Sequence, residues 1–379
     1  MITIRPGSHT HRLLIFLSYT GEIPVSAVKL LGSENTWRLL IQKLSQPQEF
    51  RFADGTDRFS CRMLNISGKG RLKTMRLSRT AIPILARLDT LAYTYYERTF
   101  LQHNFSGTDT HIERHHRVAE AAVMCDAAGI ETRPYCLPPL QNQQICRIVP
   151  NHPSFYVSRE LKGVGEGEEN KTNFSRIVGA LFYPGGCHAL FNTRKTCMKW
   201  YGRGENKVHD NLEKIARWNA GVDSVPSAIL LGADYKIALR TMKEVCANRK
   251  LDLRFDAIYD HIHYVPMNAA GVKMLRLLTA PDWNEQLLDL VFDPADRNQQ
   301  PGSIEYDANV NGVYVLSHLD GDIARLFRFY EAWATFPGRT EILCYPFQVA
   351  FLRELFGNKI PLRTIDIAEV EKEICPDWG

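Results

Sequence analysis

The stretch Gly32-Ser33-Glu34-Asn35-Thr36-Trp37-Arg38-Leu39-Leu40-Ile41-Gln42-Lys43-Leu44 decides how the first part of the chain folds. Ser33 is a residue type that caps helix N-termini, and Glu34 in the first turn is favourable to the helix dipole. Apolar side chains at helical spacing predict a buried face made of Trp37, Leu40, Ile41 and Leu44. The other faces carry residue types that bond phosphates and base edges, namely Asn35, Arg38, Gln42 and Lys43.

Two shorter helices are predicted before this one. The first covers residues 9–19 and is closed by Thr20-Gly21. The second covers residues 24–31, has Val25, Val28 and Leu31 on one face, and stops at Gly32, which can take a positive φ. Two helices joined by a tight turn, with polar side chains on the second, are typical of a helix-turn-helix.

Strand-like segments with many basic residues follow. Residues 49–52 and 58–66 alternate around an Asp54-Gly55 turn, and residues 67–70 form a second turn before residues 74–78. Two acids, Asp54 and Asp57, accompany eight bases in residues 51–79: Arg51, Arg58, Arg62, Lys69, Arg71, Lys73, Arg76 and Arg79. A basic hairpin after a recognition helix predicts a wing on DNA phosphates, contacted by Arg58, Lys69, Arg71 and Lys73.

The distribution of charge supports this interpretation. The whole chain has a formal net charge of +4, but residues 1–100 carry +8 and the remainder carries −4. A basic first quarter indicates a polyanionic partner, and double-stranded DNA is the partner we expect. Two alternatives remain open: a three-helix domain with a solvated charged hairpin, or a winged helix that contacts protein.

Composition and cysteine usage set the broad class. Hydrophobic residues make up 45% and charged residues 23%, which is ordinary for a globular protein. The nine cysteines form no Cys-x-x-Cys pair, so reduced thiols in a cytoplasmic protein are expected. Neither a signal peptide nor a membrane-spanning run is visible, and no membrane partner is predicted.

Residues 101–150 are interpreted as a helical connector and linker. The preceding helix carries an aromatic stripe of Tyr93, Tyr95, Tyr96 and Phe100, which suits either a core or a homodimer contact. His111 and His115 lie one helical turn apart, but no third ligand follows at a spacing typical of metal sites, so no metal site is predicted. Proline-rich residues 134–153 are expected to separate two domains.

Residues 151–379 alternate between strand and helix patterns and predict an α/β domain. The expected fold class is therefore α+β, with an N-terminal winged helix-turn-helix at 1–100, the helical segment at 101–150 and an α/β domain at 151–379. Hairpin strands are expected at 176–183 and 188–193, and a strand is expected over 154–162.

Candidate active sites in this part are weak. Glu160-x-Lys162, at the end of the expected strand, supplies half of a Mg²⁺-dependent nuclease motif, and Asp234-x-Lys236 supplies the same half. Strand alternation puts His261 and His263 on one side and Asp260 on the other, which leaves too few ligands for a metal. The glycine-rich residues 163–167 are not expected to form a phosphate-binding loop, because the glutamates among and after them repel phosphate. Neither a cofactor nor a metal is therefore expected, with Mg²⁺ reserved for the nuclease alternative.

Three stretches resemble the replication-relaxation family of plasmids and integrative elements: Arg76-Leu77-Ser78, His116-Arg117-Val118, and residues 176–218. The resemblance implies a winged helix joined to an α/β domain related to restriction-type nucleases. Family members carry acids along the second hairpin strand, whereas this chain has Leu190-Phe191-Asn192-Thr193, so the resemblance implies lost metal ligands. It further implies a sequence-specific DNA-binding protein of a bacterial mobile element, acting in replication, transfer or transcriptional control. A metal-dependent nuclease and a protein-binding adaptor are the alternatives.

Overall fold

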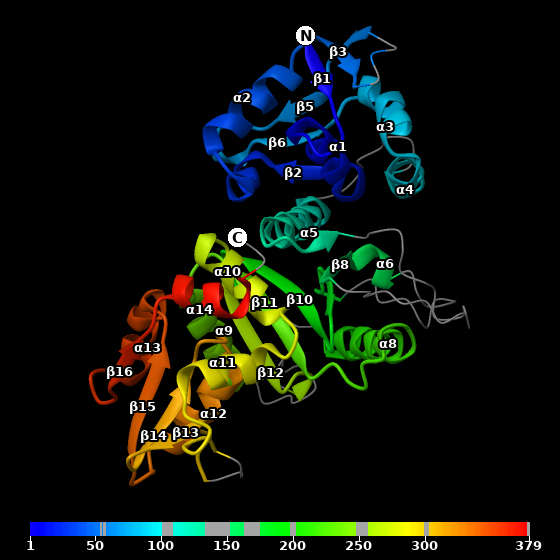
Figure 1. The fold of residues 1–379 in the computed structure, drawn as a ribbon. Coiled ribbons are helices and arrows are strands. Elements are labelled where there is room, and N and C mark those ends of the chain that lie inside the picture. The colour runs from blue at the N-terminus through cyan, green and yellow to red at the C-terminus, as the bar shows by residue number, and fades with distance from the viewer. Residues whose placement is uncertain are drawn as a thin grey trace. The chain divides into compact units, whose positions relative to one another are not determined.

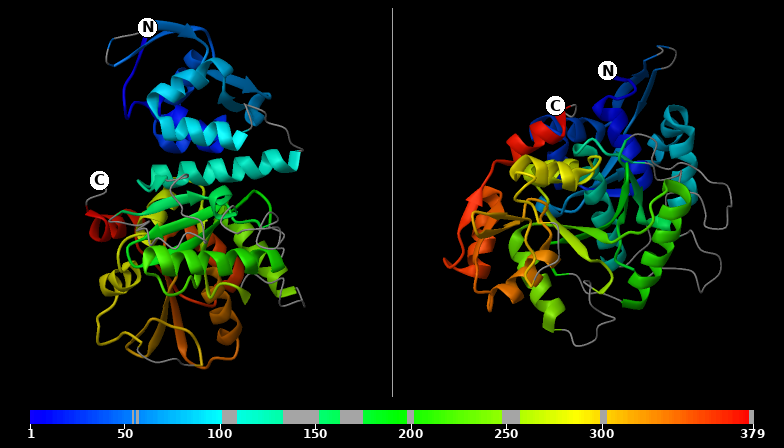
Figure 2. Two further views of the ribbon diagram at one scale, coloured as in Figure 1. Left: turned by 90° about the vertical axis from the view of Figure 1, so that its right-hand side faces the viewer. Right: turned by 60° about the horizontal axis from the view of Figure 1, so that its bottom comes forward.

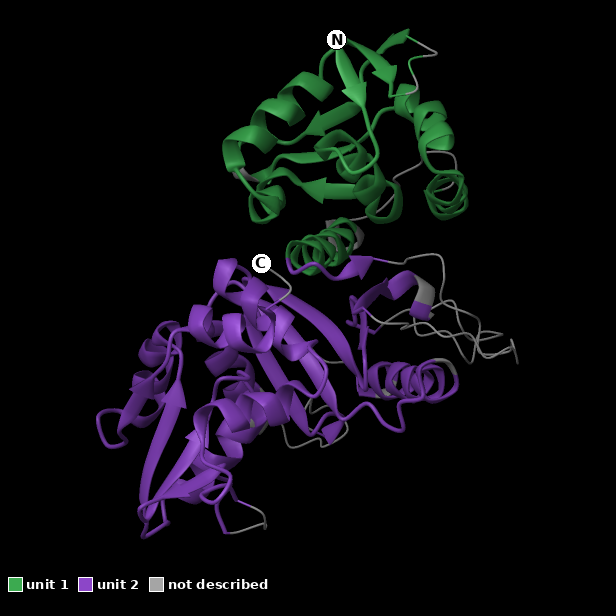
Figure 3. Cartoon of the chain, in the orientation of Figure 1, with its two compact units in different colours: residues 1–127, 133–136 green, residues 128–132, 137–379 purple. Residues whose placement is uncertain are grey.

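A computed structural model describes residues 1–53, 55, 58–100, 109–132, 152–162, 175–197, 202–247, 257–298 and 303–376. The chain divides into two compact units (Figures 1 and 3), of which unit 1 ends at Ala127 and unit 2 begins at Ala128. The described residues form helices and four sheets, which confirms a mixed class of α and β structure. Among the described helices, none has the length and apolar character needed to cross a membrane.

Unit 1 begins as the caps in the sequence predict. Helix α1 (His9–Thr20) ends at Gly21 with a φ of 74°, and α2 (Glu34–Leu44) begins where the Ser33 side chain accepts a bond from the Thr36 amide. The helix predicted at 24–31 is the 3-10 helix η1 (Val25–Leu31), which ends at Gly32 with a φ of 136°. Strand β2 (Glu22–Pro24) precedes η1 and was not predicted.

One sheet of unit 1 has the order β2-β6-β5, and all its pairs are antiparallel. Strand β5 spans Leu64–Ser67 and β6 spans Thr74–Leu77, and the single-turn helix η2 (Gly70–Leu72) lies in the loop between them. Helix η2 contacts η1, which in turn contacts α2. Helix η1 therefore lies between this loop and α2 in the network of contacts.

The second sheet of unit 1 corrects the strand predicted at 58–66. Its order is β1-β3-β4, with β1 at Ile2–Ile4, β3 at Gln48–Phe52 and β4 at Arg58–Cys61. The predicted strand is thus two strands, β4 and β5, that belong to different sheets. The Met63 amide donates to the Leu44 carbonyl at 2.9 Å, so the chain returns to the end of α2 after this excursion.

The single-turn helix η3 (Arg79–Ala81) and three longer helices follow in unit 1: α3 (Ile82–Leu88), α4 (Thr90–Phe100) and α5 (Asp109–Ala127). Tyr95, Tyr96 and Phe100 are at most 5% exposed on α4, which packs against α1 and α3, so these aromatic rings are buried in the fold. Helix α5 falls in the predicted connector, yet it belongs to unit 1. Two side-chain contacts hold it there: His116 Nε2 lies 2.7 Å from Glu22 Oε1, and Arg12 forms an ion pair with Asp126.

Unit 2 contains a six-stranded mixed sheet of order β12-β11-β10-β9-β8-β7. Strand β9 runs antiparallel to both of its neighbours, and the other pairs are parallel. The predicted hairpin is β9–β10, and the strands are β7 (Glu131–Thr132), β8 (Ser154–Val157), β9 (Gly179–Tyr183), β10 (Gly186–Arg194), β11 (Ser227–Gly232) and β12 (His261–Pro266).

A smaller sheet lies beside it in unit 2 (Figure 1), with the order β13-β14-β15-β16. Its strands are Ala308–Val310, Val313–Ser317, Arg339–Cys344 and Leu362–Thr364. The helices of unit 2 are α6 (Ser158–Lys162), α8 (Gly202–Ala220), α9 (Tyr235–Ala247), α10 (Ala269–Leu278), α11 (Trp283–Val291), α12 (Ile323–Trp333), α13 (Val349–Phe356) and α14 (Ile367–Ile374).

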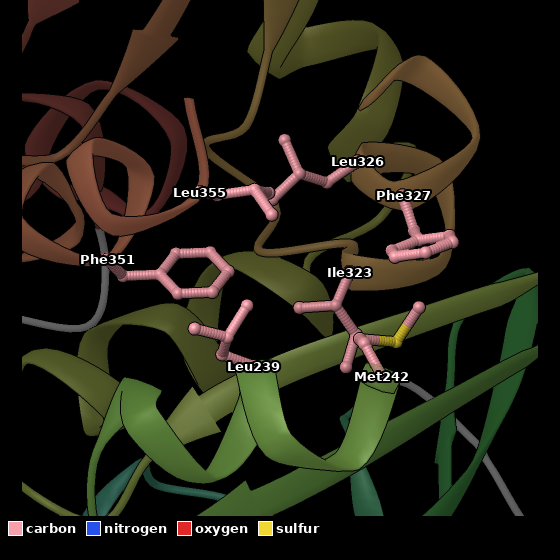
Figure 4. Close-up of a pocket in the computed structure, with 7 residues that line it drawn as sticks. All are labelled: Leu239, Met242, Ile323, Leu326, Phe327, Phe351 and Leu355. Carbon is pink, nitrogen blue, oxygen red and sulfur yellow. The ribbon is translucent and has the colours of Figure 1, made fainter. Parts of the chain in front are cut away.

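The two sheets of unit 2 share one hydrophobic core. Helices α8 and α9 pack on the large sheet (Figure 2), and α12 and α13 pack on α9 and carry the core to β14 and β15. A cavity of about 10 Å³ remains among Leu239, Met242, Ile323, Leu326, Phe327, Phe351 and Leu355 (Figure 4). Its lining is wholly apolar and it has room for about one water molecule, so we assign it to core packing.

Candidate nucleic-acid interface

The polar side chains predicted on α2 are on the surface. Asn35, Arg38, Gln42 and Lys43 are all exposed, whereas Trp37, Ile41 and Leu44 are at most 5% exposed. The Arg38 guanidinium donates to the Asn35 side-chain oxygen at 3.3 Å, because positions i and i+3 face each other on a helix. This bond holds two long polar groups together on one face, where both are accessible to a ligand.

Two further lysines of the predicted set lie in the loop between β5 and β6. Lys69 and Lys73 are exposed, and the Val25 amide bonds the Lys73 carbonyl at 2.9 Å, so the loop is tied to the start of η1. Gly68 has a φ of 79°, and a Cβ there would lie 2.4 Å from the Leu72 carbonyl oxygen. The tight loop therefore requires glycine at this position. The side chain of Arg71 lies outside the described residues.

Arg58 is exposed on β4, in the β1-β3-β4 sheet, and so is not part of the hairpin that carries Lys69 and Lys73. Two other bases of residues 51–79 are engaged within the fold. Arg51 donates to the Thr3 hydroxyl at 2.9 Å, and Arg76 lies opposite Glu22 in the β2–β6 pair. The basic segment is thus divided between two sheets.

The segment after β6 anchors both sheets. The Ser78 amide bonds the Met63 carbonyl at 2.8 Å, and the hydroxyls of Ser78 and Thr80 donate to the Arg62 carbonyl. Residues 62–63 are the junction at which β4 ends and β5 is about to begin. A hydroxyl residue is therefore needed just after the last strand, which gives a physical reason for the Arg76-Leu77-Ser78-Arg79-Thr80 pattern.

In unit 2 the structure corrects the strand expected over 154–162. Strand β8 stops at Val157, and Glu160 and Lys162 lie in helix α6, where the side chains of these two residues are outside the described set. The prediction that Glu160 and Lys162 lie at the end of a strand, as the nuclease motif requires, is therefore wrong. Strands β8–β12, described in full, contain neither Asp nor Glu.

A histidine–aspartate cluster of unit 2 joins β12 of the large sheet to the loop before α12. His261 Nδ1 lies 2.7 Å from Asp322 Oδ2, and Asp322 Oδ1 accepts bonds from the amides of Ile262, Ala324 and Arg325 at 3.0–3.1 Å. The rings of His261 and His263 are stacked with centroids 6.4 Å apart, which confirms that alternation puts them on one side. The pairing of His261 with Asp322 was not predicted, although an aspartate directly before an apolar helical pattern is itself a cap signal.

Burial and charge set the protonation states in this cluster. The hydrogen bond with Asp322 raises the pKa of His261. Burial works to raise the pKa of Asp322, but the bond with His261 and the nearby histidine charges hold that pKa well below its usual range. Burial lowers the pKa of His188 to about 3 and that of His318 to about 4, so both rings are neutral in the fold at pH 7. Within the described residues, no three His, Cys, Asp or Glu side chains converge on a metal-sized site.

We expect acid to destabilise the protein through His188 and His318. Both folded pKa values lie below the ordinary value of 6.5, so below pH 6.5 the unfolded chain binds two protons that the fold excludes. The free energy of unfolding should fall by about 3 kcal/mol between pH 6.5 and pH 5 from these two groups. The raised pKa of His261 acts in the other direction: its contribution is complete below pH 6.5 and is lost as pH rises through its folded pKa.

Urea unfolding at half-unit pH steps measures how steeply the free energy of unfolding changes with pH. His188 Nε2 bonds the Leu278 carbonyl at 2.9 Å, and its Nδ1 lies 2.6 Å from the Ser227 hydroxyl. A His188→Gln variant keeps an amide donor but cannot titrate. Below pH 6.5 the free energy of unfolding of this variant should change with pH less steeply than that of wild type, by about 1.4 kcal/mol per pH unit. An unchanged slope in that variant would contradict the assignment.

Comparison of the chain with models of known protein families, with curated protein sequences and with solved structures gives no match.

Proposed function

We propose that unit 1 is a winged-helix domain that binds double-stranded DNA. The order of elements supports this: α1, β2, η1, α2, β5 and β6 follow one another, with the three strands in one antiparallel sheet. In this arrangement α2 is the recognition helix and the β5–β6 loop is the wing. The β3–β4 hairpin is an insertion, since the chain leaves and re-enters this framework where Met63 bonds Leu44.

The observations that carry the proposal are the exposed polar face of α2 and a lysine-bearing loop that contacts η1, the helix directly before α2. Arg38 and Asn35 are matched in chemistry to guanine and adenine edges, and Lys69 and Lys73 are matched to phosphates. Phosphate contacts supply most of the affinity, while base contacts supply the sequence preference. The two kinds of residue lie on different elements, so they can be tested separately.

Arg38→Ala is expected to relax sequence preference by about 1–3 kcal/mol, because a base-edge contact is lost. Lys69→Ala is expected to weaken binding to all duplexes about equally and to reduce the salt dependence, log K against log salt, by about 1. Fluorescence anisotropy with a selected duplex and a random duplex, at several salt concentrations, measures both effects.

Lys214→Ala is the matched control, since Lys214 is an exposed helical lysine of unit 2. It should leave affinity and salt slope unchanged. Equal losses on selected and random DNA for both Arg38→Ala and Lys69→Ala would refute these roles. A wild-type chain that binds no duplex at low salt would refute the DNA-binding proposal and would favour a protein partner.

The family resemblance adds a biological setting to this proposal: replication, transfer or transcriptional control of a mobile element. Unit 2 would then be a binding platform, in line with strands β8–β12, which lack carboxylates. Both statements are predictions, and footprinting on the DNA that flanks the gene tests the first of them.

A further inference from the structure

An apolar side chain stands at the centre of the polar face of α2. Leu39 is 52% exposed, although the other large apolar residues of α2 pack into unit 1 or lie at its edge. The core on this side is complete without it, since Trp37, Ile41 and Leu44 supply the buried face. The fold gives no reason for a leucine at this position.

The neighbours of Leu39 are the residues proposed to contact DNA. On a helix, positions three and four apart are adjacent, so Leu39 lies between Asn35 on one side and Gln42 and Lys43 on the other, with Arg38 next in the chain. All four are exposed. Leu39 is thus enclosed by polar and basic groups on the surface of α2.

The charge of this surface selects the kind of partner. Glu34, in the first turn, is the only acid of α2, and Arg38 and Lys43 follow it on the exposed surface. An apolar partner surface would have to desolvate both cations without neutralising them, which is costly. A DNA major groove offers phosphates and base acceptors to the cations, and it offers one apolar group of its own, the C5-methyl of thymine.

We propose that Leu39 is a specificity-determining residue that packs against the C5-methyl group of a thymine in the major groove. The proposal rests on the DNA-binding function of unit 1 and adds the base that the site must contain. Asn35 and Arg38 would bond the neighbouring base edges. Leu39 would contact only the C5-methyl group, and would therefore favour thymine over cytosine and uracil, which lack that group.

The test uses the full-length chain and duplexes that differ by one methyl group. Binding sites are first selected from a random duplex library, and each thymine of the selected site is then replaced singly by deoxyuridine. Wild type should bind about fourfold more weakly when the contacted thymine loses its methyl, which is the value of one buried methyl-sized group. Substitution at the other thymines should have no effect.

Leu39→Ala should bind the thymine duplex about fivefold to twentyfold more weakly than wild type. It should bind the thymine and deoxyuridine duplexes equally, because the partner of the methyl is gone. Leu91→Ala is the matched control, since Leu91 is also an exposed leucine, 63% exposed on α4. That variant should keep both the affinity and the fourfold methyl effect.

Two results would overturn the inference while leaving DNA binding intact. One is a wild-type affinity that is indifferent to methyl removal at every position, and the other is a Leu39→Ala variant that keeps the full methyl effect. Failure of the full-length chain to select or bind any duplex is a different result, because it overturns the proposed function and this inference together.

Discussion

Replacing Asp322 with alanine is expected to lower the free energy of unfolding by about 3–5 kcal/mol, the largest effect we predict in unit 2. The carboxylate is buried, pairs with His261 and accepts three backbone amides, from Ile262, Ala324 and Arg325. Its removal leaves the three amides without their acceptor, and those of Ile262 and Ala324 are buried. Because Ile262 belongs to β12 and the other two amides belong to α12, the contact between β12 and α12 should weaken first.

Hydrogen exchange of the peptides covering β12 and the start of α12, together with urea unfolding, measures this loss. Asp366→Ala is the matched control: Asp366 caps α14 through the Ala368 amide at 2.8 Å, but it is exposed and pairs with no histidine. A cost of about 1 kcal/mol is expected there. If Asp322→Ala costs no more than Asp366→Ala, the cluster does not stabilise the contact between β12 and α12.

Asp322 also sets the titration of its neighbour. The bond with Asp322 is the main cause that raises the pKa of His261, so the alanine variant should return that pKa toward or below 6.5. An NMR titration of the His261 ring in both proteins reads this change separately from stability. A His261 pKa that is equal in the two proteins would show that the ion pair is absent in solution.

The second large effect is expected in unit 1, where Trp37→Ala should cost about 3–5 kcal/mol. Trp37 is 1% exposed, and its ring lies 4.8 Å from the ring of His9 at the start of α1. Truncation to alanine leaves a large cavity where α2 docks on the domain. Helix α2 should then be held less firmly, and hydrogen exchange of peptides in residues 9–44 should accelerate.

Leu39→Ala provides the control on the same helix, since an exposed leucine contributes less than about 0.5 kcal/mol to stability. The two variants compare a buried and an exposed apolar residue of the same helix. Trp37 should matter for stability, and Leu39 should matter for DNA affinity while exchange stays at the wild-type rate. Equal stability losses in the two variants would show that Leu39 is part of the core.

The local structure of unit 1 was predictable because its signals act over a few residues. Ser33 caps α2 through an amide three positions away, and Gly21 and Gly32 end their helices through a positive φ. The exposed and buried faces of α2 follow from its apolar spacing in the same way. The sequence-based interpretation gave Leu39 no role, since it considered only the polar residues of the exposed face as contacts to a partner.

What the sequence by itself determined is thus helices α1 and α2 with their caps, the β9–β10 hairpin, the charge asymmetry and the polar surface of α2. Only the tertiary structure decided that residues 58–67 serve two sheets, that Arg58 is separated from the β5–β6 loop, and that His261 pairs with Asp322, 61 residues away. The physical reason is range: caps, turns and periodicity are settled by neighbouring residues. Strand pairing and buried ion pairs depend instead on which distant segments exclude water together, and this is a property of the whole packed unit.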